Sequence, residues 1–382
     1  MMRPSQVLSL IAVAIAVAGA GLWVSRRGVD TTTEPQGQVL PLPQSDLNGV
    51  TGLRIFKGDG SHTTLTRNPA HWLVAERGYP ADTGQVRKLL LDLSALQIEE
   101  QKTSDPTLYS KLGVEDPSNA QATSTGLAIN IKGKTLGLIV GRASGTSSVY
   151  VRVKGVARSL LATPQLAPDA DPRHWLDRSL LDIASDQVTE VDLKPQSGPD
   201  YIIKRSAPPP ASGSAPIATP AYVVSPIPKG RELADASSPA SQAGALAGLQ
   251  LDDVRKAGGH TAVAHASFVT RNGLTLAISG IEDADQRYIT VVVAAPASSA
   301  QSAAPSTAQT QARDLNARLA GWEFEIPSYR YDTLFRPLEQ LLKPKAVAPK
   351  AVAPKAPAHL PFSPKSGTAG AGQDKVTPEQ SH

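Results

Sequence analysis

Residues 70–117 contain the stretch that decides the fold, AHWLVAERGYPADTGQVRKLLLDLSALQIEEQKTSDPTLYSKLGVEDP. Its centre predicts an amphipathic helix, because apolar side chains recur at three- and four-residue spacing and form one stripe. This stripe consists of Val86, Leu89, Leu90, Leu93 and Leu96. Asp82 is placed to cap the first backbone amides, with Gln85 completing a capping box. Asp105 and Gly113 predict the two ends of a second, short helical turn.

Short apolar runs separated by turn residues predict antiparallel hairpins on both sides of the helix. These runs are Leu53–Phe56, Thr63–Arg67, Trp72–Val74, Gly126–Ile131, Thr135–Val140 and Val149–Val153. A similar order recurs about 140 to 150 residues later, with Tyr222 in the place of Trp72 and a thinner helical stripe over Ala245–Val254. We therefore expect an α+β fold of two duplicated, mainly antiparallel sheet units, each covered by a helix. An ordinary alternation of strands and helices is the alternative.

Composition divides the chain into segments that can and cannot bury a core. The expected segments are an anchor or signal sequence at 1–28, a tether at 29–48, a first α+β unit at 49–184, a second unit at 185–342 and a Lys/Pro/Ala-rich tail at 343–382. Two Ala-, Ser- and Pro-rich inserts, at 206–220 and 294–311, interrupt the second unit. Because the inserts and the tail have few large apolar residues, we predict that they are disordered.

The apolar run at residues 7–24 predicts a helix of about 27 Å, which is close to the hydrocarbon thickness of a bilayer. Its anchoring residues are Val7, Leu10, Ile11, Ile15, Leu22 and Trp23. Ala18-Gly19-Ala20 also matches a signal-peptidase site, so a retained anchor and a cleaved signal both remain open. A buried soluble helix is the third interpretation. Either of the first two exports the chain.

The net charge of +4 is unevenly distributed. The first 28 residues contribute +3 and residues 343–382 contribute +4, which leaves the body between them at −3. A mildly acidic body argues against a nucleic-acid-binding face. The chain has no cysteine, which excludes disulfides, thiolate catalysis and cysteine zinc sites.

A search for catalytic or metal-binding patterns finds none that is complete. The histidines lack the i, i+4 spacing with glutamate of a helical zinc site, and His260 and His265 are the nearest pair. Gly133-Lys134-Thr135 lacks the first glycine of a phosphate loop, because position 128 is Ala. Acidic residues at 282, 283 and 285 lack the glycine and closing glutamate of a calcium loop. We therefore predict no catalytic, cofactor or metal site.

A set of motifs in the first unit carries a family resemblance. Its residues are Trp72, Pro80, Ala81, Asp82, Leu90, Leu93, Tyr109, Leu112, Gly113, Asp116, Pro117, Gly141, Trp175, Asp177 and Arg178. With these motifs, residues 50 to about 195 resemble the bacterial family catalogued as domain of unknown function 4340. The second unit is similar more loosely, although Trp322–Leu342 resembles the closing segment of the family.

This resemblance implies one amino-terminal inner-membrane helix, a body outside the cytoplasm, in the periplasm, and association with ABC transporter components related to gliding-motility auxiliary proteins. The family has no established catalytic residues, so the resemblance assigns none. We expect a non-enzymatic accessory subunit of an ABC-transporter-like or gliding-motility-like envelope complex. The alternative is a module that binds an anionic envelope polymer through the basic Lys-Pro tail, where Lys-Ala-Val-Ala-Pro occurs at 345–349 and again at 350–354. An enzyme is the third possibility.

Overall fold

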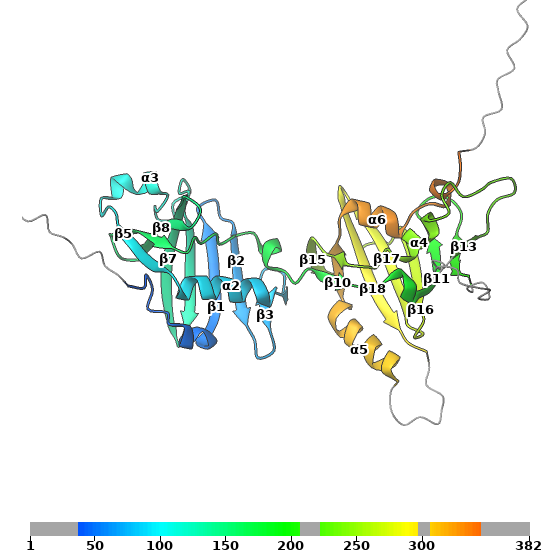
Figure 1. Ribbon diagram of the computed structural model, residues 1–382, viewed down its shortest axis with the longest axis horizontal. Coiled ribbons are helices and arrows are strands. Elements are labelled where there is room, and N and C mark those ends of the chain that lie inside the picture. Colours follow the sequence, from blue (N-terminus) through cyan, green and yellow to red (C-terminus); the bar gives the residue numbers. More distant parts are fainter. Residues whose placement is uncertain (1–36, 207–221, 297–305, 345–382) are drawn as a thin grey trace, which may run out of the picture. The chain divides into compact units, whose positions relative to one another are not determined.

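The computed structural model describes residues 37–206, 222–296 and 306–344. The predicted anchor at 7–24, nearly all of the insert at 206–220 and the tail from residue 345 lie outside these ranges. Most of the described chain forms two large antiparallel sheets with a few short helices. The α+β class is therefore confirmed (Figure 1).

The first sheet has nine strands in the order β4-β3-β2-β1-β6-β7-β8-β9-β5. Their bounds are β1 Val50–Lys57, β2 His62–Arg67, β3 Trp72–Val74, β4 Tyr79–Pro80, β5 Gln97–Gln101, β6 Thr125–Ile131, β7 Lys134–Ser144, β8 Ser148–Val153 and β9 Ser159–Thr163. Strands β1 to β3 and β6 to β8 confirm the expected hairpins. Strands β4, β5 and β9 were not predicted. Strand β5 gives no strand signal, because it is a polar run with no buried residue.

Helix α2, Thr83–Ser94, lies across one face of this sheet (Figure 1). Its predicted stripe is buried and belongs to the same core as Leu53 and Ile55 of β1. The Asp82 carboxylate accepts from the amides of Gly84 and Gln85, as expected. The capping box differs in one bond, because the Gln85 side chain donates to the Asp82 carboxylate. The Asp82 amide donates instead to the Trp175 carbonyl.

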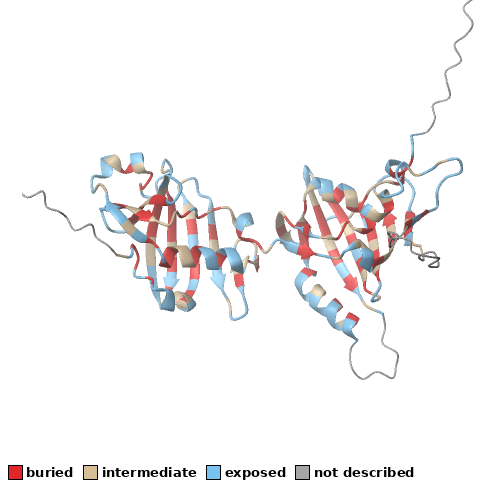
Figure 2. Ribbon diagram, viewed as in Figure 1, coloured by how far each residue is buried: buried red, intermediate tan, exposed pale blue. Residues whose placement is uncertain are grey.

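The second sheet has eight strands in the order β13-β12-β11-β16-β17-β18-β19-β15. Their bounds are β11 Val188–Lys194, β12 Tyr201–Arg205, β13 Tyr222–Ser225, β15 Asp253–Lys256, β16 Ala264–Thr270, β17 Thr275–Asp283, β18 Gln286–Ala294 and β19 Trp322–Glu325. A two-stranded pair joins β10, Ser179–Leu181, to β14, Leu249–Gln250. Figure 2 shows that buried residues concentrate in the strands of both sheets.

Eight strands of the two sheets follow one another in the same order, with β3 corresponding to β13, β1 to β11, β6 to β16 and β5 to β15. The correspondence extends to single residues. A register shift between Val50 and Gly52 of β1 recurs between Val188 and Glu190 of β11. The pairing of the neighbouring strands also places Tyr222 where the first sheet has Trp72.

The remaining helical elements are α3 Tyr109–Leu112, α4 Ser238–Ala243, α5 Thr307–Leu319, α6 Ser328–Leu334, and the 3₁₀ turns η1 Gln44–Gly49, η2 Pro106–Leu108, η3 Pro172–Trp175, η4 Ser185–Gln187 and η5 Leu338–Leu341. The expected cap at Asp105 and the left-handed terminator at Gly113 are both present. The Gly113 φ of 68° is one that residues with side chains rarely adopt.

Three boundary predictions were wrong. The helix expected over Ala245–Val254 is absent, since α4 ends at Ala243 and the apolar residues after Gly248 alternate in β14 and β15. The tether expected to extend to residue 48 enters the core by residue 39, where Val39, Leu40 and Leu42 are buried. The insert expected at 294–311 ends earlier, because Ser306 forms a capping box with Gln309 and starts α5.

Candidate functional site: a hollow on the first sheet

The family-motif residues lie in two groups on the first unit. The first group surrounds the start of α2: Ala81 pairs with Leu176, and the Asp177 amide donates to the Pro80 carbonyl at 3.0 Å. Trp72 and Trp175 are buried there, as are Leu90 and Leu93 of the helix. Arg178 extends from this group to the Leu251 carbonyl and to Asp252, at 2.9 and 2.5 Å. These contacts give the first group a structural role.

The second group lies on the opposite face of the sheet and comprises Tyr109, Leu112, Gly113, Asp116, Pro117 and Gly141. Tyr109 packs with Val114 and Ile139 in a small separate core. A side chain at Gly141 would meet the Leu112 carbonyl at 2.5 Å, so only glycine allows the segment to approach β7 so closely. The guanidinium of Arg152 lies 4.5 Å from the centre of the Tyr109 ring and donates to the Val114 carbonyl.

This second group ends at a hollow of about 520 Å³ on the face of the sheet opposite α2. Its floor is a row of paired positions with small residues in the middle and cations at the ends: Arg54 on β1, Ala128 on β6, Gly137 on β7 and Lys154 beyond β8. We call this site the first hollow. Asp116, Pro117 and Ser118 form its side wall.

Glycines on β6 and β7 allow neighbouring side chains to lie close to the backbone at the floor of the first hollow. A Cβ atom at Gly126 would lie 2.4 Å from the Phe56 ring, and one at Gly137 would lie 2.6 Å from the Lys154 side chain. The Phe56 ring and the Lys154 stem therefore lie directly over bare backbone. Arg54 in turn lies over the Phe56 ring, with its guanidinium carbon 5.6 Å from the ring centre.

The charges of the first hollow are unequally paired. Among the described residues, neither Arg54 nor Lys154 has a carboxylate within 4.0 Å, and both are exposed. Asp116 accepts from the Ser118 amide at 3.0 Å and from its hydroxyl at 2.8 Å, both at one oxygen. These two hydrogen bonds hold the pKa of Asp116 below its ordinary value. The site thus presents two cations and one ionised carboxylate around a small-residue floor.

An equivalent position on the second sheet carries a smaller hollow of about 380 Å³, the second hollow. Strand pairing places Asp192 where the first hollow has Arg54, Lys194 where it has Phe56, and His265 where it has Gly126. The two hollows therefore share their place in the sheet but differ in charge.

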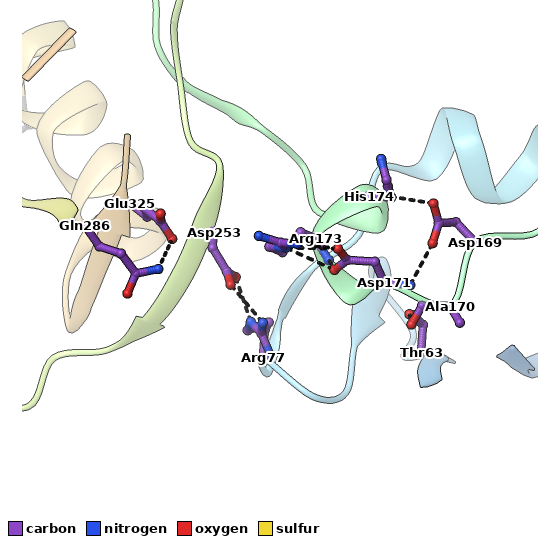
Figure 3. Close-up of polar contacts among 10 residues, drawn as sticks. All are labelled: Thr63, Arg77, Asp169, Ala170, Asp171, Arg173, His174, Asp253, Gln286 and Glu325. Atoms are coloured by element: carbon purple, nitrogen blue, oxygen red, sulfur yellow. Dashed lines mark hydrogen bonds and ion pairs between the residues drawn. The ribbon is translucent and has the colours of Figure 1, made fainter. Parts of the chain in front are cut away.

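A separate concentration of polar residues joins the turn after β3 to β15 (Figure 3). Arg77 makes two hydrogen bonds to Asp253, at 2.6 and 2.8 Å, and these raise the pKa of Arg77. Nearby, Arg173 pairs with Asp171, and the side-chain amide of Gln286 donates to Glu325 at 3.1 Å. Because these groups satisfy one another, we assign them a structural role.

The sequence motifs include residues of one wall of the first hollow but none of the residues of its floor. Asp116 and Pro117 were identified as motif residues, whereas Arg54, Phe56, Gly126, Gly137 and Lys154 were not. The available signal was the alternation of Arg54 and Phe56 on one strand with glycines on its neighbours. Within residues 37–206, 222–296 and 306–344, no three His, Cys, Asp or Glu side chains form a group that could hold a metal ion.

The chain is thus an α+β protein with two large antiparallel sheets. One face of each sheet is exposed and carries a hollow. A sequence model of the domain of unknown function DUF4340 matches residues 72–267, so the chain belongs to this family. No curated protein and no solved structure matches the chain significantly. None of the helices in the described part of the chain is long and apolar enough to cross a membrane.

Proposed function

We propose that this protein is a non-enzymatic, membrane-anchored protein whose body lies outside the cytoplasm and serves as an accessory subunit of an ABC-transporter-like envelope complex. The apolar run at 7–24 supports the anchor. The observation that carries the binding role is the first hollow, where two cations without ion-pair partners in the described chain flank a floor of small residues. Such an open, charged surface suits recognition of a partner.

The finer architecture belongs to the same proposal. We interpret the two sheets as products of an internal duplication, since eight corresponding strands share one order and one register shift. Duplication gives the chain two equivalent faces with different charge. Such a pair suits an accessory subunit that contacts more than one component.

Co-purification tests the accessory role. The full chain, carrying a carboxyl-terminal tag, is extracted from its own membranes in mild detergent and captured under low salt. We expect ABC transporter subunits among the captured proteins, and their loss when the anchor at 1–28 is replaced by a cleavable export signal. Recovery of the bait alone from the anchored chain would contradict this function.

The cationic first hollow also favours a second function, binding of an anionic envelope polymer. The basic tail offers another binding element for the same polymer. Deletion of residues 345–382 separates the two, and it keeps Lys343, whose ammonium group is paired with Glu232 at 2.7 Å. If the tail is responsible, its deletion abolishes binding and the dependence of binding on salt. Unchanged binding by the truncated chain would exclude the tail.

A further inference from the structure

We propose that the first hollow is a recognition site for an acidic sugar, that is, a hydroxylated ring carrying a carboxylate or phosphate group. This inference deepens the second proposed function and rests on it. It assigns polymer recognition to the folded first sheet, and no longer to the tail. Three features of the hollow carry the assignment: its cations, its single carboxylate and its floor.

The cations require an anionic ligand. Arg54 and Lys154 stand at the two ends of one row across four neighbouring strands, so their backbones are about 14 Å apart at the usual strand spacing. The Lys154 stem lies over Gly137 of this row, whereas Arg54 lies along the Phe56 ring, which belongs to the adjacent outward-facing pair of positions. A guanidinium and an ammonium so placed can bracket one acidic ring or two successive acidic groups of a polymer.

Asp116 requires that the ligand also donate hydrogen bonds. Its Oδ1 already accepts from Ser118, and no donor among the described residues reaches its Oδ2. An ionised carboxylate repels a ligand that carries only negative groups, but it attracts a hydroxyl. A sugar acid supplies both the anion and the hydroxyl within one ring. An acidic peptide side chain supplies only the anion.

The floor fits a flat ring. The Phe56 ring lies flat over Gly126 and the Lys154 stem lies over Gly137, so the half-buried Phe56 ring, Ala128 and this stem form a low apolar surface. The C–H face of a sugar ring can pack on such a surface, and the volume of about 520 Å³ lies within the range of small-ligand sites. Backbone groups in the middle of the sheet are already bonded, so the named side chains must provide the specificity.

The second hollow provides an internal control. It occupies the equivalent place, but Asp192 stands where Arg54 stands in the first hollow. Lys194 lines this second hollow and has no ion-pair partner among the described residues. Removing Lys194 therefore changes the net charge as much as removing Arg54 or Lys154, without touching the proposed site.

Isothermal titration calorimetry of the detergent-solubilised full chain tests the site. The probes are trigalacturonate, glucose 6-phosphate, maltotriose as the neutral sugar and hexaglutamate as the acidic peptide. We expect binding of at least one acidic sugar, weakened by salt, and no binding of maltotriose. Arg54→Ala and Lys154→Ala each weaken it by about tenfold, whereas Lys194→Ala stays within about twofold of the unmodified chain. Lys154→Arg restores binding, which excludes loss of folding as the cause.

Four outcomes of this titration are distinguishable. Tighter binding of either trigalacturonate or glucose 6-phosphate supports the site and identifies the acidic group that it prefers. Equal binding of hexaglutamate overturns the sugar assignment in favour of an acidic protein partner. Normal affinity in Arg54→Ala and Lys154→Ala, together with loss of binding on deletion of 345–382, overturns the hollow but leaves polymer binding standing. No binding of any acidic probe by the unmodified chain overturns both.

Discussion

Glu323 on β19 shows how one buried charge is stabilised in the second sheet. Its side chain is almost fully buried, and it accepts from Arg255 Nε at 2.7 Å and from the Gly258 amide at 3.1 Å. The ring of His260 lies 3.0 Å away. Burial alone would raise the pKa of Glu323, but the hydrogen bonds from His260, Arg255 and Gly258 outweigh it and lower the pKa below 4.5.

This lowered pKa predicts acid sensitivity. Because the folded pKa lies below the unfolded one, Glu323 stabilises the fold fully above about pH 4.5, and its contribution is lost as the pH falls through the folded pKa. Glu323→Gln should cost roughly 3 kcal/mol at pH 7, since it removes the buried carboxylate that pairs with Arg255 and leaves this guanidinium only the more exposed Asp283. It should also flatten the loss of stability below about pH 4.5. Urea unfolding between pH 3 and 7 measures both effects. An identical pH dependence in the two chains would contradict the assignment.

At the level of single residues, the sequence predicted local features well and distant contacts poorly. The caps at Asp82 and Asp105 and the terminator at Gly113 depend on neighbours within a few positions, so their residue types suffice to identify them. Arg54 and Lys154 share a hollow only because β1, β6, β7 and β8 pair in one register. Register between distant strands is not encoded in any local pattern.

At the level of elements, helix α2 is the part of the first unit most open to a test by mutation. Leu93 is 1% exposed and lies in the main core. Leu93→Ala should therefore cost roughly 2 to 5 kcal/mol of unfolding free energy. Leu91 on the same helix is only half-buried, so Leu91→Ala is the matched control and should cost clearly less.

Leu249 gives the corresponding test in the second half. Leu249 belongs to the thinner stripe that was expected to be helical, but it lies in strand β14 and is also 1% exposed. Leu249→Ala should now cost as much as Leu93→Ala, because both create a cavity in one continuous core. Urea titrations of the three variants measure these losses of unfolding free energy. Equal small losses at Leu91, Leu93 and Leu249 would contradict this core.

Elements were predictable where apolar spacing and turn residues agreed. The β1–β2 hairpin follows from alternating residues around Gly58-Asp59-Gly60, and the Asp59 carboxylate accepts from the Ser61 amide as such a turn requires. Strand β5 is Gln97-Ile98-Glu99-Glu100-Gln101, and its polar sequence does not predict a strand. It is held in the sheet by antiparallel pairing with β9. The helix expected over Ala245–Val254 was misassigned for a different reason, because its apolar residues fit either a helical or a strand period.

At the scale of the whole molecule, two sheets of common order carry two hollows of different charge. Binding of an envelope partner or polymer by the first hollow requires that this face be outside the cytoplasm. The accessory role and the binding of an envelope polymer both depend on that placement. The chain has no cysteine of its own, so introduced cysteines can report it without interference.

The most direct test is labelling of single cysteines by a membrane-impermeant maleimide on intact spheroplasts. Val292→Cys places the thiol on an exposed position of β18, 59% exposed, and Leu276→Cys places it in the fully buried core as the control. We predict that the thiol at position 292 is labelled in intact spheroplasts, and that the thiol at 276 reacts only after denaturation. Labelling at 292 that requires lysis of the spheroplasts would place the body inside the cytoplasm and contradict the account.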